Sequence, residues 1–337
     1  MVKKLAIGLL TVVVILVLVS FLLPRHVHVE RSTSINGSIH TIHTYLNGFS
    51  TFNEWSPWAE IDPNTQYTFS GPRSGVGAKM AWTSEDRNVG SGSQEIMESS
   101  PQEIKVKLDF GSQGVADAYY RLMAEGSGTQ VIWGFDTDLG FNPISRYFGL
   151  MMDKWIGGDY AKGLAKLKEK VEALPQTDFS SLQVEEVTVE PQPIVYVSTQ
   201  SSREEASIQT AITNAYGQVG QYMAQHGLEM AGPPMTINTS WDENGYVFDA
   251  AMTVKAAPEE APAEDNPVKV GTSYSGKALK TVLKGPYSGM EARYNELMAY
   301  MAASGYKQNG RPWDVYANDP TTVQPEEIET HIYMPVE

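Results

Sequence analysis

Cysteine is absent from this sequence: none of its 337 residues is Cys. A chain without thiols cannot form disulfides, bind zinc through thiolates, use a thiol nucleophile or be lipidated at cysteine. Basic side chains are scarce too, since 25 Lys and Arg stand against 40 Asp and Glu and the net charge is −15. Residues 176–337 carry nine basic and 22 acidic side chains. Because phosphate contacts need clustered Lys and Arg, we predict no nucleic-acid partner.

Short enzyme motifs are missing as well. The sequence has no P-loop, no HExxH and no Ser–His–Asp set in a recognisable context, and no helix-turn-helix segment precedes its C-terminal half. His40 and His43 are three residues apart, but no third ligand follows nearby. We therefore predict no cofactor, no metal site and no assigned catalytic residue. Whether the chain is an enzyme stays open, with a binding role favoured.

One long apolar run stands at the N-terminus. Residues 5–23 contain no charge, follow Lys3 and Lys4, and as a helix span about 28 Å, close to the hydrocarbon thickness of a bilayer. We predict that residues 1–26 are a single-pass membrane anchor. A cleaved signal peptide is the alternative, although its apolar stretch is usually shorter and ends in small residues. The two lysines favour a cytoplasmic N-terminus and extracytoplasmic (periplasmic-side) domains.

Residues 27–175 show an α+β pattern of one strand, short helices, several antiparallel strands and a long closing helix. Residues 103–110 alternate apolar and charged side chains, which is typical of an antiparallel strand with one wet face. Asn142 and Pro143 stand where a cap and a first helical residue are expected. We predict a domain in which one sheet packs against this helix.

Two stretches of this region, FNEWSPWAEID (52–62) and SGPRSGVGAKMAW (70–82), resemble the START/polyketide-cyclase superfamily of helix-grip domains. The resemblance covers residues 27–175 and implies a curved sheet that grips the long helix around an apolar cavity. Ligand pockets are mainly apolar and aromatic. The candidates for the cavity lining are Trp55, Trp58, Trp82, Trp133, Phe148, Met152 and Trp155. For each of them, an ordinary place in the core is the alternative.

A repeated pattern marks the second half of the chain. GLEMAGPPM (227–235) and GYKQNGRPW (305–313) share two glycines and a proline at a constant offset of 78 residues. Each follows a helical stretch and precedes strands. After a linker and first strand at 176–190, we therefore predict two strand–helix–strand–strand repeats, about 194–255 and 268–337. Two such units related by a pseudo-twofold axis can join their strands, cover one face with helices and leave a groove on the other.

The paired G-x₄-G-x-P motifs and the ending VYANDPTTVQPEEIETHIYMPV resemble a GyrI-like domain over residues 183–337. This family is the effector-binding module also found in AraC- and MerR-type regulators. The resemblance implies a groove for small, often amphipathic or cationic molecules, commonly with a Glu in the pocket floor, and some relatives are hydrolases. Here the equivalent positions hold Asp249 and His331, with Glu329 two residues away, which puts the hydrolytic chemistry in doubt.

Strand alternation predicts which side chains face this groove. We place the apolar set of Met235, Ile237, Trp313 and Val315 towards the helices, and Thr236 and Asp314 on the groove side. An aromatic face next to an acid would suit a cation. The predicted ligand-binding residues are Asn238, Asp249, Trp313, Tyr316, Glu329, His331 and Tyr333.

Three functions follow from these patterns. The first is a membrane-tethered protein, without a DNA-binding part, that binds a hydrophobic, amphipathic or cationic small molecule as a sensor or sequestering protein. The second is a hydrolase acting in the groove, and the third is a structural membrane protein that docks a partner not identified by the sequence. The partners predicted are a small molecule and the bilayer.

Overall fold

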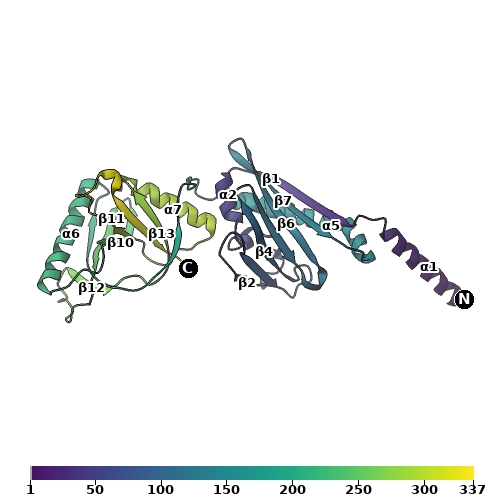
Figure 1. Cartoon of the computed structure of the whole chain (residues 1–337), viewed down its shortest axis with the longest axis horizontal. Coiled ribbons are helices and arrows are strands. Elements are labelled where there is room, and N and C mark those ends of the chain that lie inside the picture. Colours follow the sequence, from purple (N-terminus) through teal and green to yellow (C-terminus); the bar gives the residue numbers. More distant parts are fainter. Residues whose placement is uncertain (1) are drawn as a thin grey trace. The chain divides into compact units, whose positions relative to one another are not determined.

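The computed structural model describes residues 2–337, and the fold is mixed α+β as predicted (Figure 1). The chain divides into two compact units. One contains the described residues up to Ser180 together with Ala299–Gly305, and the other contains Ser181–Met298 and Tyr306–Glu337. The first helix, α1 (Val2–Ser20), has a mean hydropathy of 2.3 over Lys3–Ser20. It is long and apolar enough to cross a membrane.

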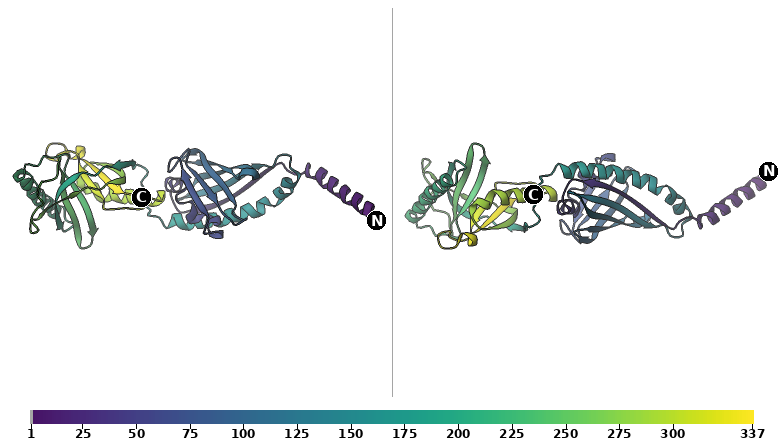
Figure 2. Two further views of the ribbon diagram at one scale, coloured as in Figure 1. Left: turned by 90° about the horizontal axis from the view of Figure 1, so that it is seen from below. Right: turned by 90° about the horizontal axis from the view of Figure 1, so that it is seen from above.

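The first unit contains one antiparallel sheet of seven strands within residues 26–138, in the order β1-β7-β6-β5-β4-β3-β2. Its elements after α1 are β1 (His26–Ile35), α2 (Ile39–Leu46), α3 (Phe52–Trp55), α4 (Pro57–Ile61), β2 (Gln66–Ser70), β3 (Lys79–Thr83), β4 (Ser91–Ser100), β5 (Glu103–Asp109), the 3₁₀ turn η1 (Gly111–Gln113), β6 (Val115–Glu125), β7 (Gly128–Asp138) and α5 (Pro143–Glu172). The predicted alternation in β5 is confirmed, since Ile104 and Val106 are buried. Figure 2 shows α5 lying along one face of this sheet.

Helix α5 begins as predicted. The side chain of Asn142 accepts hydrogen bonds from the backbone N–H groups of Ile144 and Ser145, and Pro143 is the first helical residue. Leu164, Leu167 and the rest of the buried face of the helix pack into the same core as the inner face of the sheet. Burial of this apolar face, rather than intrinsic helix propensity, is the main source of stability for such a helix.

The second unit contains an antiparallel sheet of eight strands within residues 185–335, in the order β12-β9-β11-β10-β14-β15-β13-β8. Its elements are β8 (Glu185–Val189), β9 (Pro193–Ser201), α6 (Glu205–Gln225), β10 (Met235–Asp242), β11 (Gly245–Thr253), β12 (Val268–Thr272), β13 (Gly276–Lys284), the 3₁₀ turn η2 (Tyr287–Gly289), α7 (Met290–Ser304), β14 (Trp313–Tyr316), the 3₁₀ turn η3 (Pro325–Glu327) and β15 (Glu329–Pro335). The same order of strands and helix occurs twice.

The register at the centre of this sheet reveals the pseudo-twofold axis. Thr236 of β10 and Asp314 of β14 are 78 residues apart, and they are direct antiparallel partners. The axis therefore passes between these two residues. Gly227 and Gly305, at the same offset, end α6 and α7 with φ of +63° and +67°, a conformation that favours glycine. The repeated glycines of the two motifs therefore mark equivalent helix ends in the two copies.

A strand precedes each strand–helix–strand–strand unit and pairs with the other copy. The first of these, β8, lies in the strand predicted within residues 176–190, whereas β12 was not predicted as a separate strand. β8 precedes β9 in the chain but pairs with β13, while β12 precedes β13 but pairs with β9. The two copies therefore exchange their edge strands.

Candidate functional site

The candidate site is a groove of about 810 Å³ on one face of the second sheet. This volume lies within the usual range for small-molecule pockets, roughly 300–1,000 Å³. The opposite face is covered by helices: Val219 and Met223 of α6 are buried against strands β9 and β11. Apolar and aromatic side chains make up much of the groove lining: Val187, Val189, Ile194, Tyr196, Met235, Ile237, Tyr274, Trp313, Val315 and Tyr333.

One row of cross-strand neighbours forms the floor of the groove. Tyr333, Trp313, Ile237 and Asp249 are consecutive partners across β15, β14, β10 and β11. Because neighbouring strands lie about 4.8 Å apart, Trp313 and Asp249 are separated by roughly 10 Å across the sheet. The row joins an aromatic end to an acidic end.

The aromatic end is a stack of parallel rings. The ring centroids of Trp313 and Tyr333 lie 4.8 Å apart with an interplanar angle of 2°. Tyr274 tilts against Trp313 at 5.5 Å, and the Lys280 ammonium lies 5.9 Å from the centre of the Tyr333 ring. Trp313 is only 7% exposed, so its plane is held by its neighbours. This end offers a rigid apolar surface to a flat ligand.

The acidic end is an ion pair. The Asp249 carboxylate is nearly buried and accepts hydrogen bonds from Arg311 at 2.7 Å and from the Ser198 hydroxyl at 2.6 Å. Arg311 also donates to the backbone oxygens of Ile237 and Asn238. Asp249 is therefore neutralised by a fixed guanidinium rather than left free. Arg311 was missed from the sequence, although it lies inside the repeated GYKQNGRPW motif.

The polar residues assigned to the groove side of β10 and β14 lie instead beneath the helices. Asn238 donates at 2.9 Å both to Asp314 and to the hydroxyl of Tyr294 on α7. Tyr294 donates to Asp314 at 2.7 Å, and Tyr316 hydrogen-bonds Thr236. Burial raises the pKa of Asp314 to about 6, against the lowering effect of these hydrogen bonds.

The predicted orientation of these two strands was therefore wrong. Asn238 and Tyr316 face the helices, whereas Met235, Ile237, Trp313 and Val315 line the groove. The physical reason is that the helices carry tyrosines, whose buried hydroxyls need polar partners on the sheet. Of the predicted ligand-binding residues, Asp249, Tyr333 and Trp313 line the groove, although strand alternation had placed Trp313 towards the helices.

Glu329 and His331 hydrogen-bond each other at 2.6 Å and are not among the residues that line the groove. The hydrogen bond from His331 lowers the pKa of Glu329 below its ordinary value. A carboxylate with a lowered pKa is a weak general base, so this arrangement does not favour the activation of water.

In the first unit, the predicted lining residues mostly pack on one another. Trp133 is buried, stacks on Tyr160 at 3.8 Å and touches Trp55 and Trp58 edge-on. Trp82 packs against Phe110, and both are partly buried against the same core. On α5, Met152 is half-buried, while Phe148 and Trp155 are exposed. The prediction that these residues share one cavity lining was wrong, because the rings of Trp55 and Trp133 fill the core and Phe148 and Trp155 face outward.

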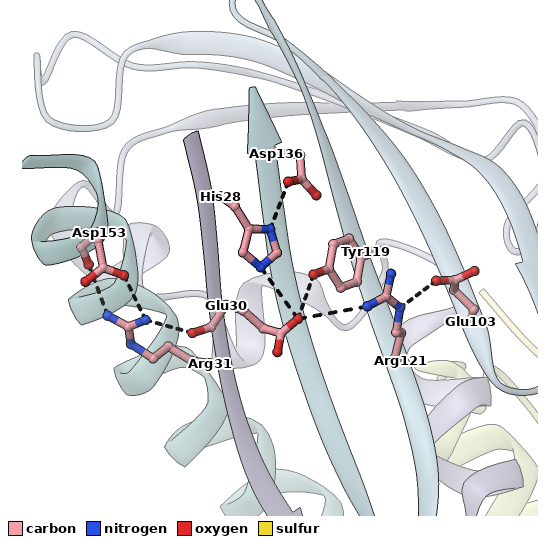
Figure 3. Close-up of polar contacts among 8 residues, drawn as sticks. All are labelled: His28, Glu30, Arg31, Glu103, Tyr119, Arg121, Asp136 and Asp153. Carbon is pink, nitrogen blue, oxygen red and sulfur yellow. Dashed lines mark hydrogen bonds and ion pairs between the residues drawn. The ribbon is translucent and has the colours of Figure 1, made fainter. Parts of the chain in front are cut away.

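The first sheet also carries a polar network on its open face, which the sequence did not predict (Figure 3). Tyr119 lies over Gly134 and donates to Glu30 at 2.7 Å, and His28 hydrogen-bonds Asp136 at 2.8 Å. Arg121 pairs with Glu103 at 2.8 Å. Within residues 2–337, no group of three His, Asp or Glu side chains is placed to hold a metal ion. The network pairs the carboxylates of Glu30, Glu103 and Asp136 with Arg121, Tyr119 and His28.

Comparison with known proteins identifies both units as small-molecule binding domain types. Residues 182–337 match the family model described as a GyrI-like small molecule binding domain. Residues 26–172 match the one described as polyketide cyclase / dehydrase and lipid transport. The chain therefore joins a domain of the polyketide cyclase type to a GyrI-like domain, as the sequence resemblances implied.

Several solved structures are similar to the chain. A cryo-EM structure of an EcmrR–DNA complex has 16% identity and a TM-score of 0.41, covering 58% of this chain and 72% of that one. The EcmrR C-terminal domain has 18% identity and a TM-score of 0.40, covering 46% and 98%. An uncharacterized conserved protein from Listeria innocua has 16% identity and a TM-score of 0.36, covering 51% and 98%. None of the curated proteins compared with the chain matches it.

Proposed function

We propose that the chain is a membrane-tethered receptor that binds one amphipathic small molecule in the groove of its GyrI-like unit. The observation that carries this proposal is the row in which Trp313, stacked on Tyr333, lies two strands from Asp249 of the Asp249–Arg311 ion pair. A flat apolar group fits the rings, and a polar group about 10 Å away reaches the ion pair. The receptor acts as a sensor or sequestering protein rather than as a DNA-binding regulator.

The charges of the groove favour a cationic end on the ligand. Its lining contains three acids, Asp249, Glu185 and Glu190, against the two bases Lys280 and Arg311. Residues 176–337 have a strong excess of acidic side chains, which also opposes binding to a polyanion. A ligand ammonium competes with Arg311 for Asp249, so binding requires a ring large enough to add apolar contact as well.

Calorimetric titration with two matched tricyclic probes tests the proposal. We expect 9-aminoacridine, which is cationic at neutral pH, to bind more tightly than uncharged acridine. Asp249→Asn removes the anionic partner and abolishes this preference, while Tyr333→Leu weakens both probes because it removes the stacked ring. Glu264→Gln removes an exposed acid outside the groove lining and serves as the control.

Absence of binding by both probes, or an unchanged preference in Asp249→Asn, would contradict this reading. Native mass spectrometry of the purified chain then searches for a co-purified molecule of another class. The hydrolase alternative gains support only from steady turnover of activated esters that is lost in Glu329→Gln. A partner recovered from the membrane, with neither binding nor turnover, supports docking.

The anchoring part of the proposal rests on the apolar helix α1. Its composition and length suit a membrane span, and Lys3 and Lys4 favour a cytoplasmic N-terminus. The two folded units then lie on the outer side. Since the chain has no cysteine, a single Glu264→Cys variant reports its side of the membrane through labelling of intact cells with an impermeant maleimide. Labelling only after lysis would contradict the orientation.

A further inference from the structure

The first half of α5 carries an exposed apolar stripe. Ile144, Phe148, Met151 and Trp155 follow one another at intervals of four, three and four residues, which places them on one face of the helix. Their exposed fractions are 67%, 53%, 44% and 46%. The outward face of a helix on a soluble domain is normally polar, and a contiguous apolar surface marks a contact site.

The stripe is confined to the end of α5 where the helix begins. Phe141, just before the helix, is 70% exposed and extends the apolar surface in that direction. In the other direction, seven residues beyond Trp155, the same face presents Lys162, which is exposed. The apolar character therefore ends midway along the helix, although the helix continues to Glu172.

This end of α5 is joined to the end of α1. The Tyr147 hydroxyl donates to the backbone oxygen of Leu16 at 2.8 Å. The Arg146 guanidinium donates to the backbone oxygens of Ser20, Phe21 and Leu23 at 3.2–3.4 Å. Helix α1 ends at Ser20, so the oxygens of Phe21 and Leu23 have no intrahelical donor, while the Ser20 oxygen also accepts from the backbone N–H of Leu23 at 3.1 Å. The first turns of α5 are thus held beside the last turn of the apolar helix.

We infer that the α5 stripe is a second membrane contact, seated in the interfacial layer of the bilayer that α1 spans. Phe21 and Leu22, just after α1, and Phe141, just before α5, are exposed as well. The Arg146 guanidinium lies 5.5 Å from the centre of the Phe21 ring and 6.0 Å from that of Phe141, which brings these apolar groups to the same end of α5. Bulky apolar residues with a Trp at the outer limit are typical of helices that lie partly immersed, about 5–10 Å into the boundary of headgroups and acyl chains. Lipid therefore covers this face, and a protein partner is an alternative outcome of the test.

The absence of cysteine makes this contact directly measurable. Separate variants of the full-length chain each carry a single Cys in place of Phe148, Met151, Lys162 or Leu10. This Cys is labelled with the environment-sensitive fluorophore NBD. Each labelled protein is reconstituted into phosphatidylcholine/phosphatidylglycerol vesicles with and without lipid carrying a doxyl quencher, which lies high on the acyl chain for the three α5 sites and near the end of the chain for Leu10. Lys162 is the matched control on the same helix face, and Leu10 reports the span of α1 itself.

We expect quenching at Phe148 and Met151 to be at least about twofold stronger than at Lys162, because only the stripe reaches the acyl-chain boundary. If Leu10 is quenched but Phe148 and Met151 are quenched no more than Lys162, the second contact is overturned and the anchor stands. Loss of quenching at Leu10 as well overturns the anchor and the inference with it. A blue-shifted but unquenched signal at the stripe assigns the surface to a protein contact and also overturns the inference.

Discussion

The buried carboxyl group of Asp314 makes the stability of the GyrI-like unit depend on pH. Burial raises its pKa from 3.8 to about 6, because its three hydrogen-bond donors do not replace the lost hydration. The folded state therefore binds this proton more tightly than the unfolded state. The corresponding stability is complete below the unfolded pKa and is lost as the pH rises through the folded one. The whole effect amounts to about 3 kcal/mol of free energy of unfolding.

Over the pH range of an ordinary unfolding experiment, the expected change in the free energy of unfolding is smaller than this total. Raising the pH from about 5 to about 7.5 should lower the free energy of unfolding of this unit by about 1 kcal/mol through Asp314 alone. Urea titration of the full-length chain in detergent, read by hydrogen–deuterium exchange of β10 and β14, measures this unit separately. Asp314→Asn cannot titrate and should remove that part of the slope. A variant with the same slope as the original chain would refute the reasoning.

Three further substitutions test the first unit by chemical unfolding monitored with circular dichroism. Gly134→Ala would place a Cβ 1.9 Å from the Tyr119 ring. The ring must then leave its hydrogen bond to Glu30, which should lower the free energy of unfolding by about 1 kcal/mol. Unchanged stability would show that the ring adapts freely. Asn142→Ala removes the cap of α5 and should cost about 1 kcal/mol, whereas Asn142→Asp should retain the cap. Trp133→Leu removes the ring stacked on Tyr160 and should cost about 3 kcal/mol; a loss below about 1 kcal/mol would contradict its central place in the core.

The duplication was predictable because it rests on local chemistry. A helix that ends in a left-handed residue favours glycine wherever it occurs, so Gly227 and Gly305 mark the same place in both copies. The closing helix of the first unit was predictable for a similar reason, since Asn142 and Pro143 act on their own neighbours. The exchange of edge strands was not, because an alternating strand does not specify which copy it pairs with.

The groove was harder to predict because β10 and β14 carry apolar side chains on the face that lines the groove and polar side chains on the face beneath the helices. The alternation of a strand divides its residues into two sets but does not show which set faces the helices. The usual rule that the apolar set faces the helices failed for β10 and β14. The tyrosines that reversed it, such as Tyr294, lie on another element. The Asp249–Arg311 pair joins residues 62 positions apart and leaves no local pattern. Trp133 and Trp313 look alike in sequence, yet one fills a core and the other lines a groove.

The exchanged strands β8 and β12 also have a consequence for biosynthesis. The earliest strand of the GyrI-like unit cannot find its partner until β13 has been made, well after the first helix and hairpin of the unit. Neither copy can complete its own sheet edge, and a fragment ending after β11 would expose both β9 and an unpaired β8. Pairing over such long separations slows folding. Nearly the entire unit must therefore be synthesised before the groove is complete and can bind a ligand.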